Sequence, residues 1–110
     1  MNDPIFVGET VSATLPLTRW QGERGTYHLV TFVGDEAEAL TTHAALQKLE
    51  FGRARGFGSI KLTARIGETE WRTSVFPQKT STEWVLLVSK KVMHAENLSP
   101  GDRIEATLVL

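Results

Sequence analysis

The chain has 110 residues, of which 41% are hydrophobic and 23% are charged, and its formal net charge is −1 at pH 7. This length predicts a single domain, residues 1–110, that is large enough to bury a core. The absence of cysteine excludes disulfides and thiolate metal sites, and the near-neutral charge argues against a protein that depends on phosphate contacts.

The first residues, MNDPIFVGE, carry an acidic side chain and no basic one before a short apolar run, which is not typical of a secretory signal. No apolar stretch approaches the ~20 residues needed to cross a bilayer. We therefore expect a soluble, cytoplasmic protein with no membrane partner.

Residues 9–18 alternate apolar and polar side chains, which predicts a strand with one solvent-exposed face. Pro16 cannot donate a ladder hydrogen bond, so this part of the strand should lie at a sheet edge or a bulge. After turn residues at 21–25, residues 26–33 are rich in β-formers and apolar on both faces. That pattern is typical of a central strand that is covered on both sides.

Residues 34–51 favour helix, with Asp35 placed to cap the first turn. The apolar residues fall on two different helical faces, Ala37, Leu40 and Ala44 on one and Leu46 and Leu49 on the other. Because one straight amphipathic helix would not present both faces to one core, we expect two short helices, broken near Thr41 and Thr42. Residues 52–56, GRARG, should then link back to the strands.

The stretch SIKLTARIGETEWRTSVF predicts a β-hairpin with a two-residue type II′ turn at Gly67 and Glu68. Counting outward from this turn gives an apolar face with the pairs Ile66–Thr69, Ala64–Trp71, Leu62–Thr73 and Ile60–Val75. The opposite face carries the polar pairs Arg65–Glu70, Thr63–Arg72 and Lys61–Ser74. A slip of one residue would destroy both patterns, so the register is strongly specified.

Residues 83–89 predict a further strand, and Ser89 is placed to cap a short helix that runs through Asn97. The sequence SPGD predicts a type II turn in which Gly101 has a positive φ. Residues 103–110 predict the last strand. The total of about six strands with one or two short helical insertions predicts a mainly β protein, a small barrel or sandwich.

The segment RGFGSIKLTARIGETEWRTSVFP, followed by VLLVSKKVMHAENLSPGDRIEATLVL, resembles the DUF1905 family of domains of unknown function. The resemblance covers roughly residues 9–110. It implies a small closed or double-split β-barrel akin to AbrB- and MazE-like proteins, and it implies no known activity. The helical segment 34–53 is longer than is usual in the family.

A DNA-binding barrel of the AbrB type is one alternative function. Such binders are obligate dimers whose basic loops meet the phosphates. Here the corresponding stretch offers only Lys90 and Lys91, and a chain of this length can complete a barrel alone. We therefore expect nucleic acid not to be the partner, and the protein to be a monomer or a homodimer.

An uncharacterised enzyme is the other alternative. The three histidines, at 28, 43 and 94, lack the spacing of a metal-binding motif. Ser74 and Ser89 do not lie in a nucleophile motif, and no carboxylate pair is evidently arranged for acid–base work. We therefore expect a non-enzymatic protein with no catalytic residue, metal or cofactor.

The polar face of the predicted hairpin is the remaining candidate site. It predicts a binding site for a small anionic ligand or an acidic protein partner, made of Lys61, Arg65, Arg72 and Ser74, with Lys90 nearby. Arginine can hold a carboxylate or phosphate with two parallel hydrogen bonds. An ordinary solvated sheet face is the alternative interpretation. The tryptophans are expected in the core and at the barrel ends rather than in a ligand cage: Trp20, Trp71 and Trp84.

Overall fold

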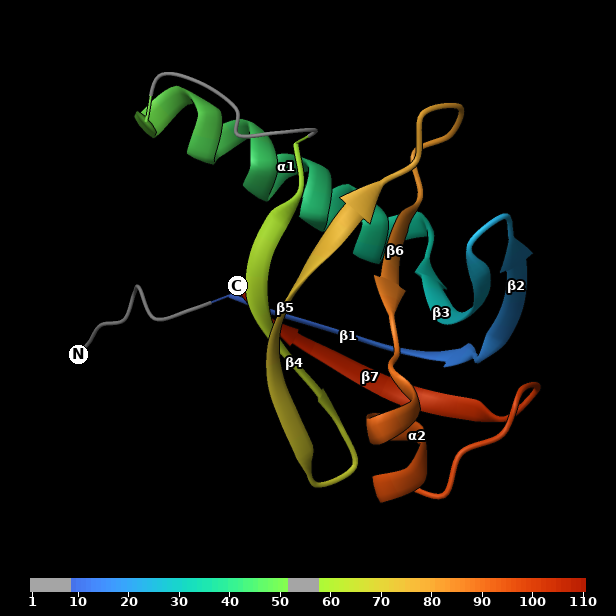
Figure 1. Ribbon diagram of the computed structural model, residues 1–110. Coiled ribbons are helices and arrows are strands. Elements are labelled where there is room, and N and C mark those ends of the chain that lie inside the picture. Colours follow the sequence, from blue (N-terminus) through green and yellow to red (C-terminus); the bar gives the residue numbers. More distant parts are fainter. Residues whose placement is uncertain (1–8, 52–57) are drawn as a thin grey trace.

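The computed structural model describes residues 9–51 and 58–110, so the predicted linker at 52–56 lies outside the described residues. The fold is mainly β, as the sequence predicted (Figure 1). The elements in chain order are β1 (Thr10–Pro16), β2 (Thr18–Gly22), β3 (Gly25–Phe32), α1 (Gly34–Phe51), β4 (Ile60–Ile66), β5 (Thr69–Pro77), β6 (Trp84–Leu87), α2 (Lys90–Ala95) and β7 (Arg103–Val109).

The described strands form one antiparallel sheet of seven strands in the order β1-β7-β4-β5-β6-β3-β2. β1 and β2 stand at opposite ends of this order, although only Leu17 separates them in the chain. The sheet must therefore curl to bring its two ends together, and Figure 1 shows the resulting half-barrel. The expected closed barrel of about six strands is wrong, because Leu17 divides the predicted first strand and the sheet stays open.

Leu17 is held at this junction by the turn that precedes β7. Its amide donates to the Asp102 carbonyl at 2.8 Å, and its carbonyl accepts from the Gly101 amide at 2.7 Å. Gly101 has φ 95°, and the Asp102 amide donates to the Ser99 carbonyl at 3.0 Å, which confirms the predicted turn. Pro16 ends β1, an edge strand of the described sheet, as predicted.

The inner face of the curled sheet carries the core. Its buried side chains alternate along the strands, as in Ile60, Leu62, Ala64 and Ile66 of β4 and Ile104, Ala106 and Leu108 of β7. α1 lies across one end of the half-barrel (Figure 1) and buries Ala37 and Leu40 against it. The indole Nε1 of Trp84 donates to Thr41 Oγ1 at 3.0 Å, which satisfies the polar atom of a buried tryptophan.

α1 is one continuous helix, so the predicted break near Thr41 and Thr42 is wrong. Its first half packs on the core, while its second half extends beyond the sheet and leaves Leu46 and Leu49 59% and 80% exposed. One helix therefore accommodates both apolar faces, because only the face with Ala37 and Leu40 packs on the core. Asp35 lies within the first turn, because the helix begins at Gly34 rather than after a cap at Asp35.

The hairpin register is confirmed pair by pair, from Ile66 with Thr69 at the turn to Ile60 with Val75 at the far end. Gly67 has φ 60° and is the first central residue of the turn, as in type II′. Trp71 is partly buried against the core and Arg72 is exposed, as the predicted register requires.

α2 begins after the predicted cap, since the Ser89 hydroxyl accepts from the Val92 amide at 3.3 Å. The helix ends earlier than predicted, at Ala95. Asn97 has φ 56°, and the Leu98 amide donates to the Met93 carbonyl at 2.8 Å. These two features form a Schellman-type end, which stops the helix and directs Glu96 toward the hairpin turn.

Candidate functional site

The predicted basic residues of the hairpin gather on the outer face of the sheet, the face turned away from the core. The β4–β5 ladder pairs Lys61 with Ser74, Thr63 with Arg72, and Arg65 with Glu70. We call Lys61, Arg65, Arg72 and Ser74 the basic patch. Its three basic side chains are exposed, and Ser74 is half-buried.

Two arginines of the basic patch are oriented by local hydrogen bonds. Arg65 Nε donates to the Gly67 carbonyl at 3.1 Å, and Arg72 Nη1 donates to Thr63 Oγ1 at 3.3 Å. Among the outer-face positions of β4 and β5, Glu70 is the one acidic residue. The patch therefore has a local excess of positive charge on a chain whose net charge is −1.

Lys90 does not share an element with the basic patch. It is the exposed first residue of α2, whereas α2 reaches the hairpin through Glu96, beyond the other end of the helix. Glu96 Oε2 accepts from Thr69 Oγ1 at 2.6 Å and from the Glu68 amide at 3.3 Å. The contribution of Lys90 to a site remains a prediction.

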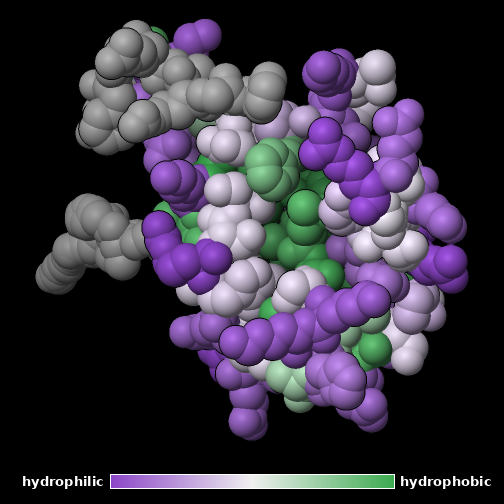
Figure 2. All heavy atoms as spheres, viewed as in Figure 1, coloured by the Kyte–Doolittle hydropathy of each residue, from purple (hydrophilic) through white to green (hydrophobic). Residues whose placement is uncertain are grey.

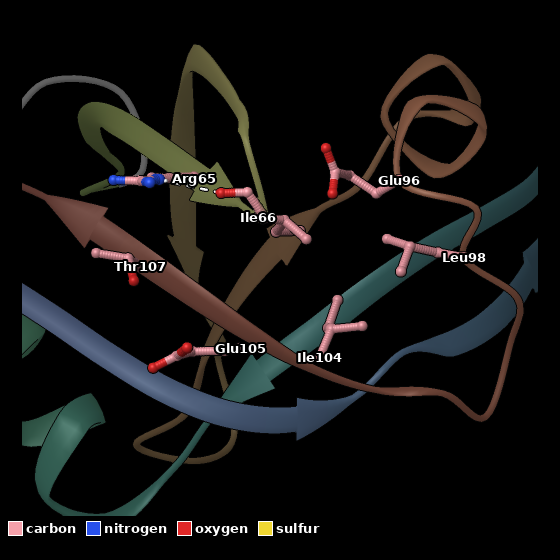
Figure 3. Close-up of a pocket in the computed structure, with 8 residues that line it drawn as sticks. Arg65, Ile66, Glu96, Leu98, Ile104, Glu105 and Thr107 are labelled. Carbon is pink, nitrogen blue, oxygen red and sulfur yellow. Dashed lines mark hydrogen bonds between the residues drawn. The ribbon is translucent and has the colours of Figure 1, made fainter.

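An open depression of about 470 Å³ lies beside Arg65 (Figure 3). Its walls come from β4, β7 and the segment after α2: Arg65, Ile66, Gly67, Glu96, Leu98, Ile104, Glu105 and Thr107. Figure 3 shows Ile66 between Arg65 and Glu96, with Leu98 and Ile104 below Glu96 in this view. Glu96 and Glu105 line this depression together with Arg65. Because two acidic residues and one basic residue surround it, the depression does not extend the positive field of the basic patch.

The outer face also carries apolar side chains, some of them on β3, a strand that the sequence predicted to be buried on both faces. β3 was expected to be covered on both sides, but only its inner residues Val30 and Phe32 are buried. Leu29, on the outer face, pairs with Leu87 of β6, which is 39% exposed. Phe76 of β5, 38% exposed, pairs with Val85 of β6. Val85 itself is buried, but Leu29 is only half-buried. The prediction that β3 is covered on both sides is therefore wrong.

This apolar surface continues to the edge of the sheet. Tyr27 lies two positions from Leu29 on β3 and pairs with Trp20 of β2, and the two ring centroids are 5.7 Å apart. Trp20 is 56% exposed, so it does not belong to the core. We define the apolar strip as Trp20, Tyr27, Leu29, Phe76, Val85 and Leu87; Val85 is buried beneath its neighbours, Leu29 is half-buried and the other four are exposed.

Figure 2 shows the distribution of hydrophobic and hydrophilic side chains on one face of the molecule. Hydrophobic atoms gather near the middle of the face, where β5 and β6 run, and hydrophilic side chains surround them. The sequence contained a signal for this strip, namely apolar residues on both faces of 26–33, but periodicity alone does not reveal whether a second face is covered.

None of the helices in residues 9–51 and 58–110 has the length and apolar composition of a membrane-spanning segment. In the same part of the chain, no three His, Cys, Asp or Glu side chains lie close enough together to hold a metal ion.

The curled seven-stranded sheet with one long and one short helix defines a small, mainly β domain with an exposed mixed face. The chain belongs to the family described as Domain of unknown function (DUF1905), whose model matches residues 13–108. This match confirms the family resemblance read from the sequence. None of the curated proteins compared with the chain matches it.

Proposed function

We propose that this domain is a non-enzymatic binding module of the cytoplasm and that its basic patch binds an anionic group, carried by a small ligand or by a protein partner. The observation that carries the proposal is the β4–β5 register. It puts Lys61, Arg65 and Arg72 on one exposed face, where Glu70 is the one acidic residue among the outer positions of β4 and β5.

Anion binding by this patch follows from the geometry of its side chains. Lys61 lies opposite Ser74, so an ammonium and a hydroxyl flank the same position. Arg65 and Arg72 are each steadied by a hydrogen bond to the hairpin itself. A guanidinium that is already oriented loses less side-chain entropy when it forms paired bonds to a carboxylate or phosphate.

The charges around the patch favour a compact anion over a long one. Glu105, on the neighbouring strand β7, and Glu96, beyond the hairpin turn, both line the depression beside Arg65. A duplex that crossed this face would meet these carboxylates, and weak long-range attraction is expected from a chain near neutrality. We therefore propose a relation to AbrB- and MazE-like barrels in fold and not in DNA binding. Lys90 is a peripheral member of the proposed site.

Isothermal titration tests this proposal with four probes: citrate, inorganic pyrophosphate, an acetylated hexaglutamate peptide and a short DNA duplex. We expect a compact anion to bind the wild type and to lose at least about tenfold in affinity, or about 1.4 kcal/mol, in the double variant Arg65→Ala with Arg72→Ala. The control Arg19→Ala with Arg24→Ala removes the same charge from exposed positions of β2 and the following turn.

The control variant should bind like the wild type. The Arg65→Ala, Arg72→Ala variant should unfold within about 1 kcal/mol of the wild type, because exposed charged pairs contribute little to stability. Equal binding by both double variants would contradict the proposal. Tight, salt-sensitive binding of the duplex would favour the DNA-binding alternative instead.

A further inference from the structure

We propose that the apolar strip and the basic patch form one continuous docking surface for an extended segment of a partner protein that carries acidic residues at one end and large apolar residues at the other. This inference rests on the proposed function, because it names the kind of molecule that bears the anionic group. It adds a second half to the site, formed by side chains of β2, β3, β5 and β6.

The two patches meet on β5. Side chains of one strand alternate between faces, so Arg72, Ser74 and Phe76 all point outward. Ser74 belongs to the basic patch through its pairing with Lys61, and Phe76 belongs to the strip through its pairing with Val85. No strand intervenes between them, so one ligand can contact both patches.

The strip then continues across neighbouring strands in register. Val85 and Leu87 share the outer face of β6, and Leu87 pairs with Leu29 of β3. Tyr27 follows on the same face of β3, and its partner Trp20 stands on the edge strand β2. The surface thus runs over the strands β4, β5, β6, β3 and β2 without a change of face.

The composition of this surface points to a protein segment. Arginine and aromatic residues are the types that dominate binding energy at protein interfaces, and a cluster of exposed large apolar residues is unusual on a monomer surface. A free small anion would use only the basic patch. The strip would then stay exposed to water, at a free-energy cost that docking of apolar side chains removes.

The length and polarity of the partner segment follow from the sheet. Four interstrand steps of ~4.8 Å separate β4 from β2, so the surface spans ~19 Å, which an extended peptide covers with about six residues. Lys61 and Arg72 mark one end, and the Trp20–Tyr27 pair marks the other. Acidic side chains of the segment should therefore lie over β4 and β5, and its apolar side chains over β6, β3 and β2.

A displayed library of random 12-residue peptides provides the probe. The wild-type domain is used for selection, and the strongest peptides are synthesised and titrated by calorimetry. We expect peptides with Asp or Glu grouped on one side of Trp, Phe or Leu. Their affinity should fall at least about tenfold for Arg72→Ala and equally for Leu87→Ser, with Phe76→Ser as a second variant of the strip.

Leu46→Ser is the matched control, because Leu46 is an exposed leucine of α1 that lies outside the proposed surface. It should leave peptide affinity unchanged. Thermal unfolding of each variant checks that it folds, and Leu87 and Phe76 are exposed enough for a serine to be tolerated. The fluorescence of Trp20 gives an independent readout at the far end of the strip, since its environment should change on binding.

The outcomes separate this inference from the proposed function. If Leu87→Ser and Phe76→Ser bind the peptides like the wild type while Arg72→Ala does not, the docking surface is wrong and anion binding stands. If Arg72→Ala also binds the peptides normally, the docking surface is wrong in both halves, and anion binding is then decided by the titration of the Arg65→Ala, Arg72→Ala variant with small anions. A dimer of the wild type in sedimentation experiments that Leu87→Ser abolishes would overturn the proposed occupant, because a second copy of the chain would then cover the strip.

Discussion

The carboxylate of Glu96, just beyond α2, accepts a 2.6 Å hydrogen bond from the hydroxyl of Thr69 at the start of β5. The same oxygen accepts from the Glu68 amide at 3.3 Å. This contact joins the only described helix between β6 and β7 to the hairpin turn. Because Arg65 donates to the carbonyl of Gly67 in that turn, the contact also supports the end of the basic patch.

Substitutions of Glu96 and Thr69 should lower stability through the same contact, so their effects should not add. Glu96→Ala should lower the free energy of unfolding by about 1–2 kcal/mol, since a partly buried hydroxyl and an amide lose a charged acceptor. Thr69→Val should cost about 1 kcal/mol. Urea denaturation of the double variant should show little loss beyond Glu96→Ala alone, and strictly additive losses would contradict the coupling.

Gly67 and Gly34 have nearly the same positive φ, although Gly67 lies in a hairpin turn and Gly34 begins a helix. Their φ angles are 60° and 59°, but a Cβ at Gly67 would overlap the Glu96 carboxylate, whereas Gly34 has nothing within 4 Å. Gly34→Ala should therefore cost about 1 kcal/mol from backbone strain alone. Gly67→Ala should cost about 2–3 kcal/mol. Combining Gly67→Ala with Glu96→Ala should recover part of the difference, and equal losses at both glycines would show that the overlap is unimportant.

Gly101 should tolerate little substitution, because its φ is 95° and its amide donates to Leu17 where the two ends of the sheet meet. Gly101→Val should lower the free energy of unfolding by about 1–3 kcal/mol. Gly101→Asn should cost less, since asparagine enters the left-handed region more readily. Thermal unfolding checks that Gly101→Val loses more stability than Gly101→Asn. A valine variant as stable as the wild type would show that the positive φ of Gly101 contributes nothing to stability.

Substitution of Trp71 by alanine should cost far more stability than the same substitution of Trp20. Trp71 packs against the core opposite the fully buried Ala64, so Trp71→Ala should cost about 3 kcal/mol through lost burial and a cavity. Trp20 is 56% exposed, and Trp20→Ala should cost about 0.5 kcal/mol or less. Guanidinium denaturation measures both, and a larger loss at Trp20 would mean that its side chain is structural rather than part of a binding surface.

The hairpin was predictable because two local patterns agreed. Alternation from Ile60 to Val75 and a glycine at the first turn position each specify the same register. The start of α2 and the turn before β7 were predictable for a similar reason, since a serine cap at Ser89 and a glycine at Gly101 have strong positional preferences. Local chemistry specifies such elements without reference to tertiary contacts.

The sequence did not predict features that depend on what lies beside an element. Apolar residues on both sides of α1 indicated two helices, yet the second half of the helix simply extends beyond the core, with Leu49 80% exposed. Apolar residues on both sides of β3 indicated two covers, yet Leu29 and Tyr27 face outward. The basic patch was predicted and the apolar strip was not, because charge is read as exposed and apolar character as buried.

The outer face of β2 to β6 as a docking surface is tested most directly by amide chemical-shift mapping with the tightest selected peptide. We predict that the perturbed amides lie in β3, β5 and β6 and along β4 beside Lys61, and that Leu87→Ser abolishes the shifts. Perturbations confined to α1, or to β1 and β7 on the other side of the sheet order, would contradict the docking surface.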